Sequence, residues 1–245
     1  MNSSVPDYKR LYRLQDKALD VLKGHLGRFY LTGGTTLGRF YLDHRFSDDL
    51  DFFVNSDPGF SQEVKRIYQR LIGQLPVDTK STVETEEFVR IWIGGEEWMK
   101  LEFVNDTGEH WGPVLRYNEV PLDNPGNVLA NKLGAMLSRD EAKDVFDIVL
   151  LAETYSFNWK KIYEHATQKQ LMNEADVVMR LTTFPVDWLK EQRWLKNPVH
   201  LPAFKEQLER IAGDFLLAKD NSLGAGKTPI EDARPKILFS EPIHF

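Results

Sequence analysis

The chain has 245 residues, no cysteine and a formal net charge of −6, with 42% hydrophobic and 28% charged residues. This composition is typical of a globular protein with its own core, and the lack of cysteine excludes disulfides and thiolate zinc sites. The acidity argues against a protein that coats bulk nucleic acid, so any nucleic-acid contact must be a local patch. No signal-peptide or membrane-span pattern is present, so we expect a cytoplasmic protein with no membrane contact.

The first hundred residues alternate between helix and strand patterns. Helical spacing of apolar residues occurs in 8–26, 35–43 and 60–74. Strand patterns occur in 29–34, 48–54, 81–93 and 97–104, with Gly94–Gly95 as a hairpin-turn signal. This order predicts a mixed α/β module.

A proline-rich stretch follows, and helical patterns fill most of the remaining chain. Prolines between 110 and 126 favour turns, so we predict an α/β domain over 1–122 and a mainly helical domain over 123–245. The expected helices are 127–138, 140–155, 158–169, 173–181, 186–195 and 201–218. The Gly- and Pro-rich tail, 219–245, is expected to run over the surface. The fold class is therefore α+β.

A glycine turn joins the first expected strand to the next helix. Gly33 and Gly34 let backbone approach a ligand, and the hydroxyl of Thr35 or Thr36 adds a hydrogen-bonding group or caps the helix. A glycine pair is by itself more often an ordinary turn.

Two aspartates open the next strand. Asp49 and Asp51 are two residues apart, so on a strand they face the same way, about 6.5–7 Å apart, while Leu50 enters the core. Two such carboxylates suit a pair of divalent cations in phosphoryl or nucleotidyl transfer. A bare pair of this kind is usually a solvated turn, but acids are depleted in strands, and these begin an apolar one.

Glu102 is the candidate third carboxylate. It lies in a later strand, where Lys100 and Glu102 share one face and Leu101 lies on the other. Beside Asp51 on a neighbouring strand, Glu102 would complete the metal site and deprotonate an attacking hydroxyl. The alternative is an exposed Lys–Glu strand face.

The segment 131–151 carries charges among apolar residues. Lys132 is placed to reach a triphosphate, and Arg139 with Asp144 to hold two helices together. Asp140 is a candidate helix cap, and Asp147 lies three residues after Asp144. Ordinary surface charge is the alternative reading of the segment.

His44 and Arg45 precede the aspartate strand. Arg45 either faces phosphate or pairs with an aspartate. The histidines have no metal-ligand spacing, and Trp92, Trp98 and Trp111 are interpreted as core residues rather than nucleobase platforms.

Taken together, these motifs resemble the AbiEii/AbiGii toxin group of DNA polymerase β-like minimal nucleotidyltransferases. GGT before a helix, HRFSDDLDFF, the KLEF strand and the later K…R…KDVFD carry the resemblance, which covers about residues 30–155. It implies a polymerase β-like fold followed by a helical domain. The family usually has Ser where Thr35 stands, and the wider superfamily commonly has Asp where Glu102 stands, so the third metal ligand stays open.

The resemblance also implies roles for particular residues. Phosphate would meet Gly34 and Thr35, metal would meet Asp49 and Asp51, and nucleotide would meet Lys132. An aspartate after the lysine helix is functional in this group, with Asp144 our first choice and Asp147 the second. Relatives are toxins of toxin–antitoxin systems, and some modify tRNA 3′ ends.

We therefore expect transfer of NMP from an NTP to an acceptor hydroxyl, with Mg²⁺, or Mn²⁺ in its place. An RNA acceptor such as a tRNA 3′ end and an antitoxin protein are the expected partners. The alternatives are a small-molecule nucleotidyltransferase of the antibiotic type and a non-catalytic nucleotide-binding module. A DxD glycosyltransferase would need a nucleotide-binding domain before the motif, and only 48 residues precede Asp49.

Overall fold

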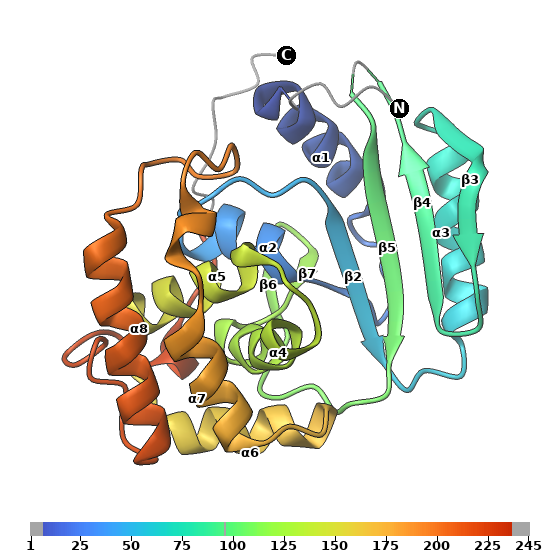
Figure 1. Ribbon diagram of the computed structural model, residues 1–245. Helices are drawn as coiled ribbons and strands as arrows, with labels where there is room; N and C mark the ends of the chain where they lie inside the picture. The colour runs from blue at the N-terminus through green and yellow to red at the C-terminus, as the bar shows by residue number, and fades with distance from the viewer. Residues whose placement is uncertain (1–6, 96, 237–245) are drawn as a thin grey trace. The chain divides into compact units, whose positions relative to one another are not determined.

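The computed structural model describes residues 7–95 and 97–236, and these residues form two compact units (Figure 1). The first unit comprises the described residues up to 36, together with 46–109 and 114–123. The second comprises 37–45, 110–113 and the described residues from 124 onward. The sequence predicted one boundary after residue 122, whereas 37–45 and 110–113 pack with the second unit.

A seven-stranded mixed sheet forms the first unit, with the strand order β3-β4-β5-β2-β1-β7-β6. The strands are β1 (Tyr30–Thr32), β2 (Leu50–Asn55), β3 (Val77–Glu84), β4 (Phe88–Ile93), β5 (Met99–Asp106), β6 (Leu115–Tyr117) and β7 (Val120–Leu122). β2 runs parallel to β5 and β1 parallel to β7, and all other neighbours are antiparallel. The α+β fold class predicted from the sequence is confirmed.

Alternating residues give the central strands one apolar face and one half-buried face. Phe52 and Phe103 are fully buried and stack on one another, and Phe29 packs against Phe103 and Phe60. The helices α1 (Tyr8–Leu22) and α3 (Phe60–Ile72) belong to this unit and contact each other. We call the half-buried face of β4, β5 and β2 the outer face; its residues are Phe88, Arg90, Trp92, Lys100, Glu102, Val104, Asp51 and Phe53.

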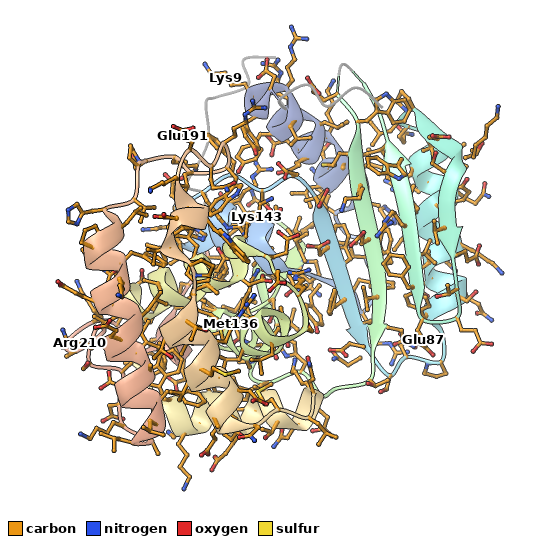
Figure 2. All side chains as sticks on the ribbon, viewed as in Figure 1. Lys9, Glu87, Met136, Lys143, Glu191 and Arg210 are labelled. Atoms are coloured by element: carbon orange, nitrogen blue, oxygen red, sulfur yellow. The ribbon has the colours of Figure 1, made fainter. Side chains whose placement is uncertain are left out.

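Two parts of the sheet differ from the prediction. The expected strand 81–93 is two antiparallel strands joined at 85–87, where Glu87 is labelled in Figure 2. The turn was missed because 85–87 contains no Gly, Pro, Asn or Asp. β6 and β7 were predicted as turns because Pro113 and Pro121 lie in or beside them, and three-residue strands have no measurable periodicity.

The helix after the glycine turn begins earlier than expected and changes its winding. It starts as α2 (Gly33–Thr36) and continues as the π-helix η1 (Leu37–Tyr41), so Thr35 and Thr36 are not its caps. Within the second unit, a Cβ at Gly38 would lie 2.8 Å from the carbonyl oxygen of Arg45. Only glycine permits this approach between η1 and the segment that follows it.

Helices make up most of the second unit. They are α4 (Pro125–Ser138), α5 (Ala142–Thr154), α6 (Trp159–Lys169), α7 (Glu174–Thr183) and α8 (Leu201–Leu216), close to the predicted ranges. The helix expected over 186–195 is only the 3₁₀ turn η2 (Val186–Leu189). Aromatic rings form the core, with Phe146 against Trp194 and Phe204, and Trp159 against Phe215.

The segment after α8 is packed, where the sequence predicted a surface tail. Ile230 of the short 3₁₀ turn η3 (Ile230–Asp232) is buried, and so is Asn221. The Asn221 amide donates to the carbonyls of Ala152 and Tyr155. The rest of the predicted tail, 237–245, lies outside the described residues. Within the described ranges, the helices are too short or too polar to cross a membrane.

Candidate active site

The two aspartates of the motif lie at the start of β2. Asp49 directly precedes the strand and Asp51 is its second residue, while Leu50 between them is fully buried. The parallel register places Asp51 opposite Glu102 on β5, and the antiparallel register places it opposite Thr32 on β1. The carboxylates of Asp49, Asp51 and Glu102 therefore lie on neighbouring positions of β2 and β5.

Two cations of the outer face pair with these carboxylates. Lys100 Nζ lies 2.9 Å from Asp49 Oδ2 and 3.7 Å from Glu102 Oε1. Arg90 Nε donates to Glu102 Oε1 at 2.7 Å. Sequence reasoning placed Lys100 and Glu102 on one face but missed Arg90, whose signal was its place in the alternation of β4. Both pairings depend on strand register, which local spacing does not reveal.

The ionisation of Asp49 reflects burial and Lys100 together. Burial raises the pKa of Asp49, and the charge and hydrogen bond of Lys100 only partly offset that rise. Burial alone would lower the pKa of Lys100, but Asp49 outweighs it and the net shift is upward. Lys100 therefore stays charged, whereas Asp49 takes up a proton at a higher pH than an ordinary aspartate does.

The glycine turn is tied directly to the carboxylate strand. Gly33 has φ +71°, and a Cβ there would lie 3.0 Å from Asp51 Oδ2. The Thr35 hydroxyl donates to the carbonyl of Asp49, so this threonine holds the strand rather than standing free for phosphate. The Thr36 hydroxyl is buried and has no hydrogen-bond partner among the described residues. Gly34, which lies between Gly33 and Thr35 in the chain, is also buried.

The chemistry of Asp49 and Asp51 fits a magnesium ion. In the part of the chain that the structure describes, no three acidic or histidine side chains converge as a complete metal site. Mg²⁺, however, is commonly bound through one or two carboxylates together with substrate phosphates. Asp49 and Asp51 at the start of β2 meet that requirement; Asp49 also pairs with Lys100, and Glu102 pairs with Arg90. A third-ligand role for Glu102 stays a prediction.

A buried ion-pair cluster lies in the second unit and has Asp147 at its centre. Asp147 is fully buried on α5 and accepts from Arg45 through Nε at 2.6 Å and Nη2 at 2.7 Å. His44 Nε2 lies 2.7 Å from Asp147 Oδ1, and Lys132 Nζ lies 2.8 Å from Oδ2. Of the two roles weighed for Arg45, the structure therefore shows pairing with an aspartate.

Asp144 is the second centre of this cluster. Lys132 Nζ donates to Asp144 at 2.6 Å, and Arg139, at the end of α4, donates to it through Nε at 2.7 Å and Nη2 at 3.0 Å. Asp144 thus joins α4 to α5. The prediction that Asp140 caps α5 is wrong. The N-cap residue of α5 is Glu141, and Asp140 pairs with Arg180 instead.

Two opposed effects fix the charges in this cluster. Burial acts to raise the pKa of Asp147, but Arg45, Lys132 and His44 outweigh it and hold the pKa well below its usual range. Asp144 behaves likewise, because Lys132 and Arg139 outweigh burial and lower its pKa. Burial lowers the pKa of His44 despite its hydrogen bond to Asp147. An ionised carboxylate only accepts, so the neutral imidazole must carry its proton on Nε2.

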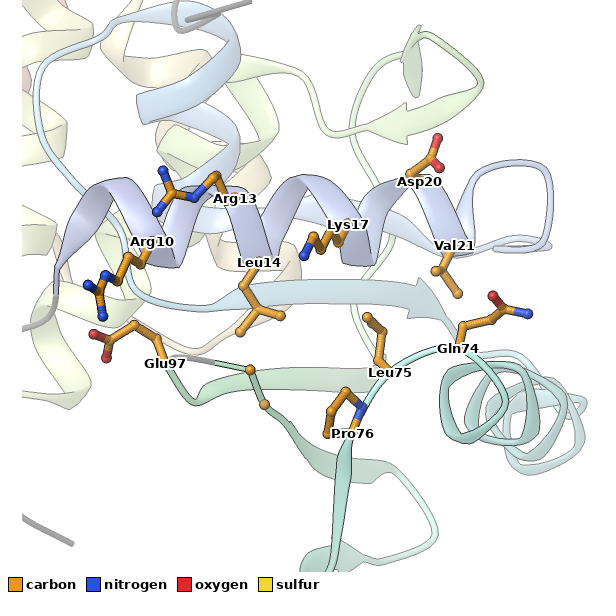
Figure 3. Close-up of a pocket in the computed structure, with 12 residues that line it drawn as sticks. Arg10, Arg13, Leu14, Lys17, Asp20, Val21, Gln74, Leu75, Pro76 and Glu97 are labelled. Atoms are coloured by element: carbon orange, nitrogen blue, oxygen red, sulfur yellow. The ribbon is translucent and has the colours of Figure 1, made fainter. Parts of the chain in front are cut away.

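Helix α1 anchors the segment that leads to Asp49. Gln15 Nε2 donates to the Ser47 carbonyl at 2.9 Å, and the Ser47 amide donates to the Tyr12 hydroxyl at 3.3 Å. The other side of α1 borders a cavity of about 830 Å³ that none of the candidate carboxylates lines (Figure 3). Its lining comprises Arg10, Arg13, Leu14, Lys17, Asp20, Val21, Gln74, Leu75, Pro76, Gly94, Gly95 and Glu97.

Comparison with protein families gives one match that spans most of the chain. The family model described as nucleotidyl transferase AbiEii toxin, Type IV TA system, matches residues 18–233. No curated protein matches the chain.

Three solved structures from two bacteria have a similar fold. JHP933 from Helicobacter pylori has a TM-score of 0.55 at 20% identity, with 86% of this chain and 92% of that chain covered. A nucleotidyltransferase toxin, MenT4 from Mycobacterium tuberculosis H37Rv, has a TM-score of 0.53 at 17% identity, covering 86% and 84%. A structure titled putative nucleotidyltransferase from H. pylori has a TM-score of 0.51 at 20% identity, covering 87% and 95%. At these identities the likeness shows the fold.

Proposed function

The chain belongs to the AbiEii family of nucleotidyl transferase toxins, and from this membership we propose that it transfers NMP from an NTP to an RNA hydroxyl, using Mg²⁺ at Asp49 and Asp51. Family membership supplies the reaction class and an antitoxin protein as partner. The metal, the NTP and the RNA acceptor are the proposal.

The observation that carries the proposal is the arrangement around the start of β2. Asp49 and Asp51 lie on one strand edge, Glu102 lies opposite Asp51, and the Gly33 backbone lies against the Asp51 carboxylate. A glycine turn that lies against the Asp51 carboxylate and is hydrogen-bonded to the Asp49 backbone suits a phosphate chain whose oxygens complete the coordination of a divalent cation.

Each residue has a definite task in this proposal. Asp49 and Asp51 hold the metal, which when bound offsets negative charge on the phosphates of the NTP. Gly33 and Gly34 allow the backbone to approach the triphosphate. The Thr36 hydroxyl, which has no partner among the described residues, donates a hydrogen bond to a phosphate oxygen. Thr35 fixes the turn to Asp49.

The proton of the acceptor hydroxyl goes to Glu102, which lies one strand from Asp51. The hydroxyl oxygen then forms its bond to the α-phosphorus as the bond to the β-phosphate oxygen breaks, so that pyrophosphate leaves. Contacts of Lys132 and Arg139 with the nucleotide, and a functional Asp144, are proposed from the family motif alone. The second unit supports a structural task for these three residues, because they pair with one another.

The test is transfer of label from each α-labelled NTP to total tRNA with Mg²⁺, comparing wild type with Asp49→Ala. We expect the variant to lose at least about 100-fold in rate, the scale for removing one key electrostatic contact in a transition state. Asp20→Ala is the matched control, because Asp20 is exposed on α1 and pairs only locally with Lys23. An Asp49→Ala protein that folds and keeps full activity would contradict the proposal.

Two other outcomes point elsewhere. Wild-type protein that binds NTP but labels no RNA has a small-molecule or protein acceptor. Wild-type protein that binds no NTP is a non-catalytic relative.

A further inference from the structure

One strand presents aromatic and basic side chains in alternation beside the carboxylates. Along β4, Phe88, Arg90 and Trp92 lie on the outer face and are half-buried, while the residues between them are buried. Successive side chains on one face of a strand are about 6.6 Å apart, far enough to take successive bases of an unstacked chain. The row therefore offers a cation between two partly accessible rings.

Arg90 is held in place by one hydrogen bond, and its terminal amino groups remain available as donors. Its Nε donates to Glu102 at 2.7 Å, and its guanidinium carbon lies 5.3 Å from the centre of the Phe88 ring. Its terminal amino groups make no hydrogen bond to any residue that the structure describes, and 37% of the side chain is exposed. A guanidinium fixed at one edge and open at the other is suited to a phosphate or a base edge.

The row lies close to the reacting groups. β4 pairs with β5 and β5 with β2, and the register aligns Arg90 with Glu102 and Glu102 with Asp51. Two strand spacings of about 4.8 Å separate the Cα atoms of Arg90 and Asp51, so a phosphate at Arg90 lies within one or two nucleotides of a hydroxyl at Asp51. Lys100, opposite Trp92, adds a second positive charge to the same face.

We propose that Phe88, Arg90 and Trp92 bind the single-stranded 3′ end of the acceptor RNA, a step that rests on the function proposed above. Sheet faces that bind single-stranded RNA stack bases on aromatic rings and hold the backbone with cations. The row supplies both, so that under this proposal an acidic chain binds RNA through a local patch. Duplex RNA buries its bases and cannot stack on the row.

The test is direct binding of a short single-stranded RNA oligonucleotide, without NTP, to wild type, Arg90→Lys, Phe88→Leu and Trp92→Leu. Loss of one stacking ring or of the guanidinium fork is expected to weaken binding about tenfold. Arg66→Lys is the control, because Arg66 is an exposed arginine of α3 that pairs with Glu63. The same RNA annealed to its complement is expected to bind more weakly than the single strand.

Unchanged affinity in all three variants, or equal affinity for duplex and single strand, would overturn the inference. So would transfer kinetics in which Arg90→Lys raises the KM for NTP and leaves the KM for RNA unchanged, because the row would then hold the nucleotide. Binding without NTP does not require catalysis, so this result is separate from the Asp49→Ala comparison that tests the function.

Discussion

Asp147 is a buried carboxylate that has three side-chain partners among the described residues of the second unit. It is completely buried and accepts from Arg45, His44 and Lys132, so one carboxylate compensates the buried charge of Arg45 and shares that of Lys132 with Asp144. Removing one partner of a buried ion pair leaves the other charge without compensation, and that penalty is larger than the net value of the pair. Asp147 is thus a structural requirement of this unit, whatever else it does.

Replacing Asp147 by Asn is expected to lower the free energy of unfolding by about 3–5 kcal/mol, because Arg45 stays buried without its counter-charge and Lys132 keeps only Asp144. Asp140→Asn is the matched change, because Asp140 is 75% exposed and pairs with Arg180 at the surface. It is expected to change stability by no more than about 0.5 kcal/mol. Urea unfolding of both variants makes the comparison. Equal losses in the free energy of unfolding would show that the Asp147 cluster does not stabilise the fold.

The sequence predicted the identities of the site residues better than their partners. Alternation alone placed Asp49 and Asp51 on one side of a strand and Glu102 on a face with Lys100, because a period of two is a local property. It did not predict that Lys100 reaches Asp49, that Arg90 holds Glu102, or that Lys132 contacts two aspartates. Those contacts join elements that only the strand register and the helix packing bring together. The catalytic roles themselves stay predictions.

Among the elements, η1 depends on the absence of one side chain. Gly38 faces the carbonyl of Arg45, and the same short segment, 37–45, carries His44 and Arg45 into the Asp147 cluster. A π-helical turn often marks a functional position in a chain. Here it closes tightly enough to bring two neighbours of Asp147 to their places.

Gly38→Ala is expected to destabilise the protein by about 1–3 kcal/mol, because the new Cβ would meet backbone at 2.8 Å and force η1 to shift. Gly213→Ala on α8 is the control of opposite sign, because nothing lies within 4 Å of a Cβ there. Alanine is the better helix former, so this change is expected to stabilise by up to about 1 kcal/mol. Thermal unfolding of the two variants distinguishes them, and a stabilising Gly38→Ala would refute the packing argument.

Long helices were predicted closely, and short elements were not. The ranges of α4 and α6 follow apolar periodicity over three turns or more, supported by the caps Asn124 and Asn158. β6 and β7 have three residues each and are stabilised by pairing that includes Leu31 opposite Leu122, some ninety residues along the chain. No local pattern contains that information.

At the scale of the whole molecule, the free energy of unfolding is expected to decrease in two stages as the pH is lowered. The folded pKa of His44 is lowered by burial, so the unfolded chain binds more protons as pH falls below about 6.5. The folded pKa values of Asp144 and Asp147 are also lowered, so their contribution is present above about 3.8 and is lost as pH falls through their folded values. Each stage favours the unfolded state on acidification.

Comparing wild type with His44→Gln isolates the first stage, because the glutamine amide still donates to Asp147 but does not titrate. Wild type is expected to lose up to about 1.4 kcal/mol more than the variant for each pH unit below 6.5, until the folded histidine takes up its proton. Urea unfolding at a series of pH values between 7.5 and about 5 measures the difference. Parallel curves for the two proteins would mean that His44 titrates alike in both states.

The ion pair between Lys100 and Asp49 has a consequence for how the protein is made. Because Lys100 lies beside Asp49, part of the cost of burying the Asp49 charge is offset without a divalent ion. We therefore expect the chain to fold without a divalent ion. Purification in the presence of a chelator is therefore expected to yield a folded protein, and under the function proposed above its transfer activity returns when Mg²⁺ is added.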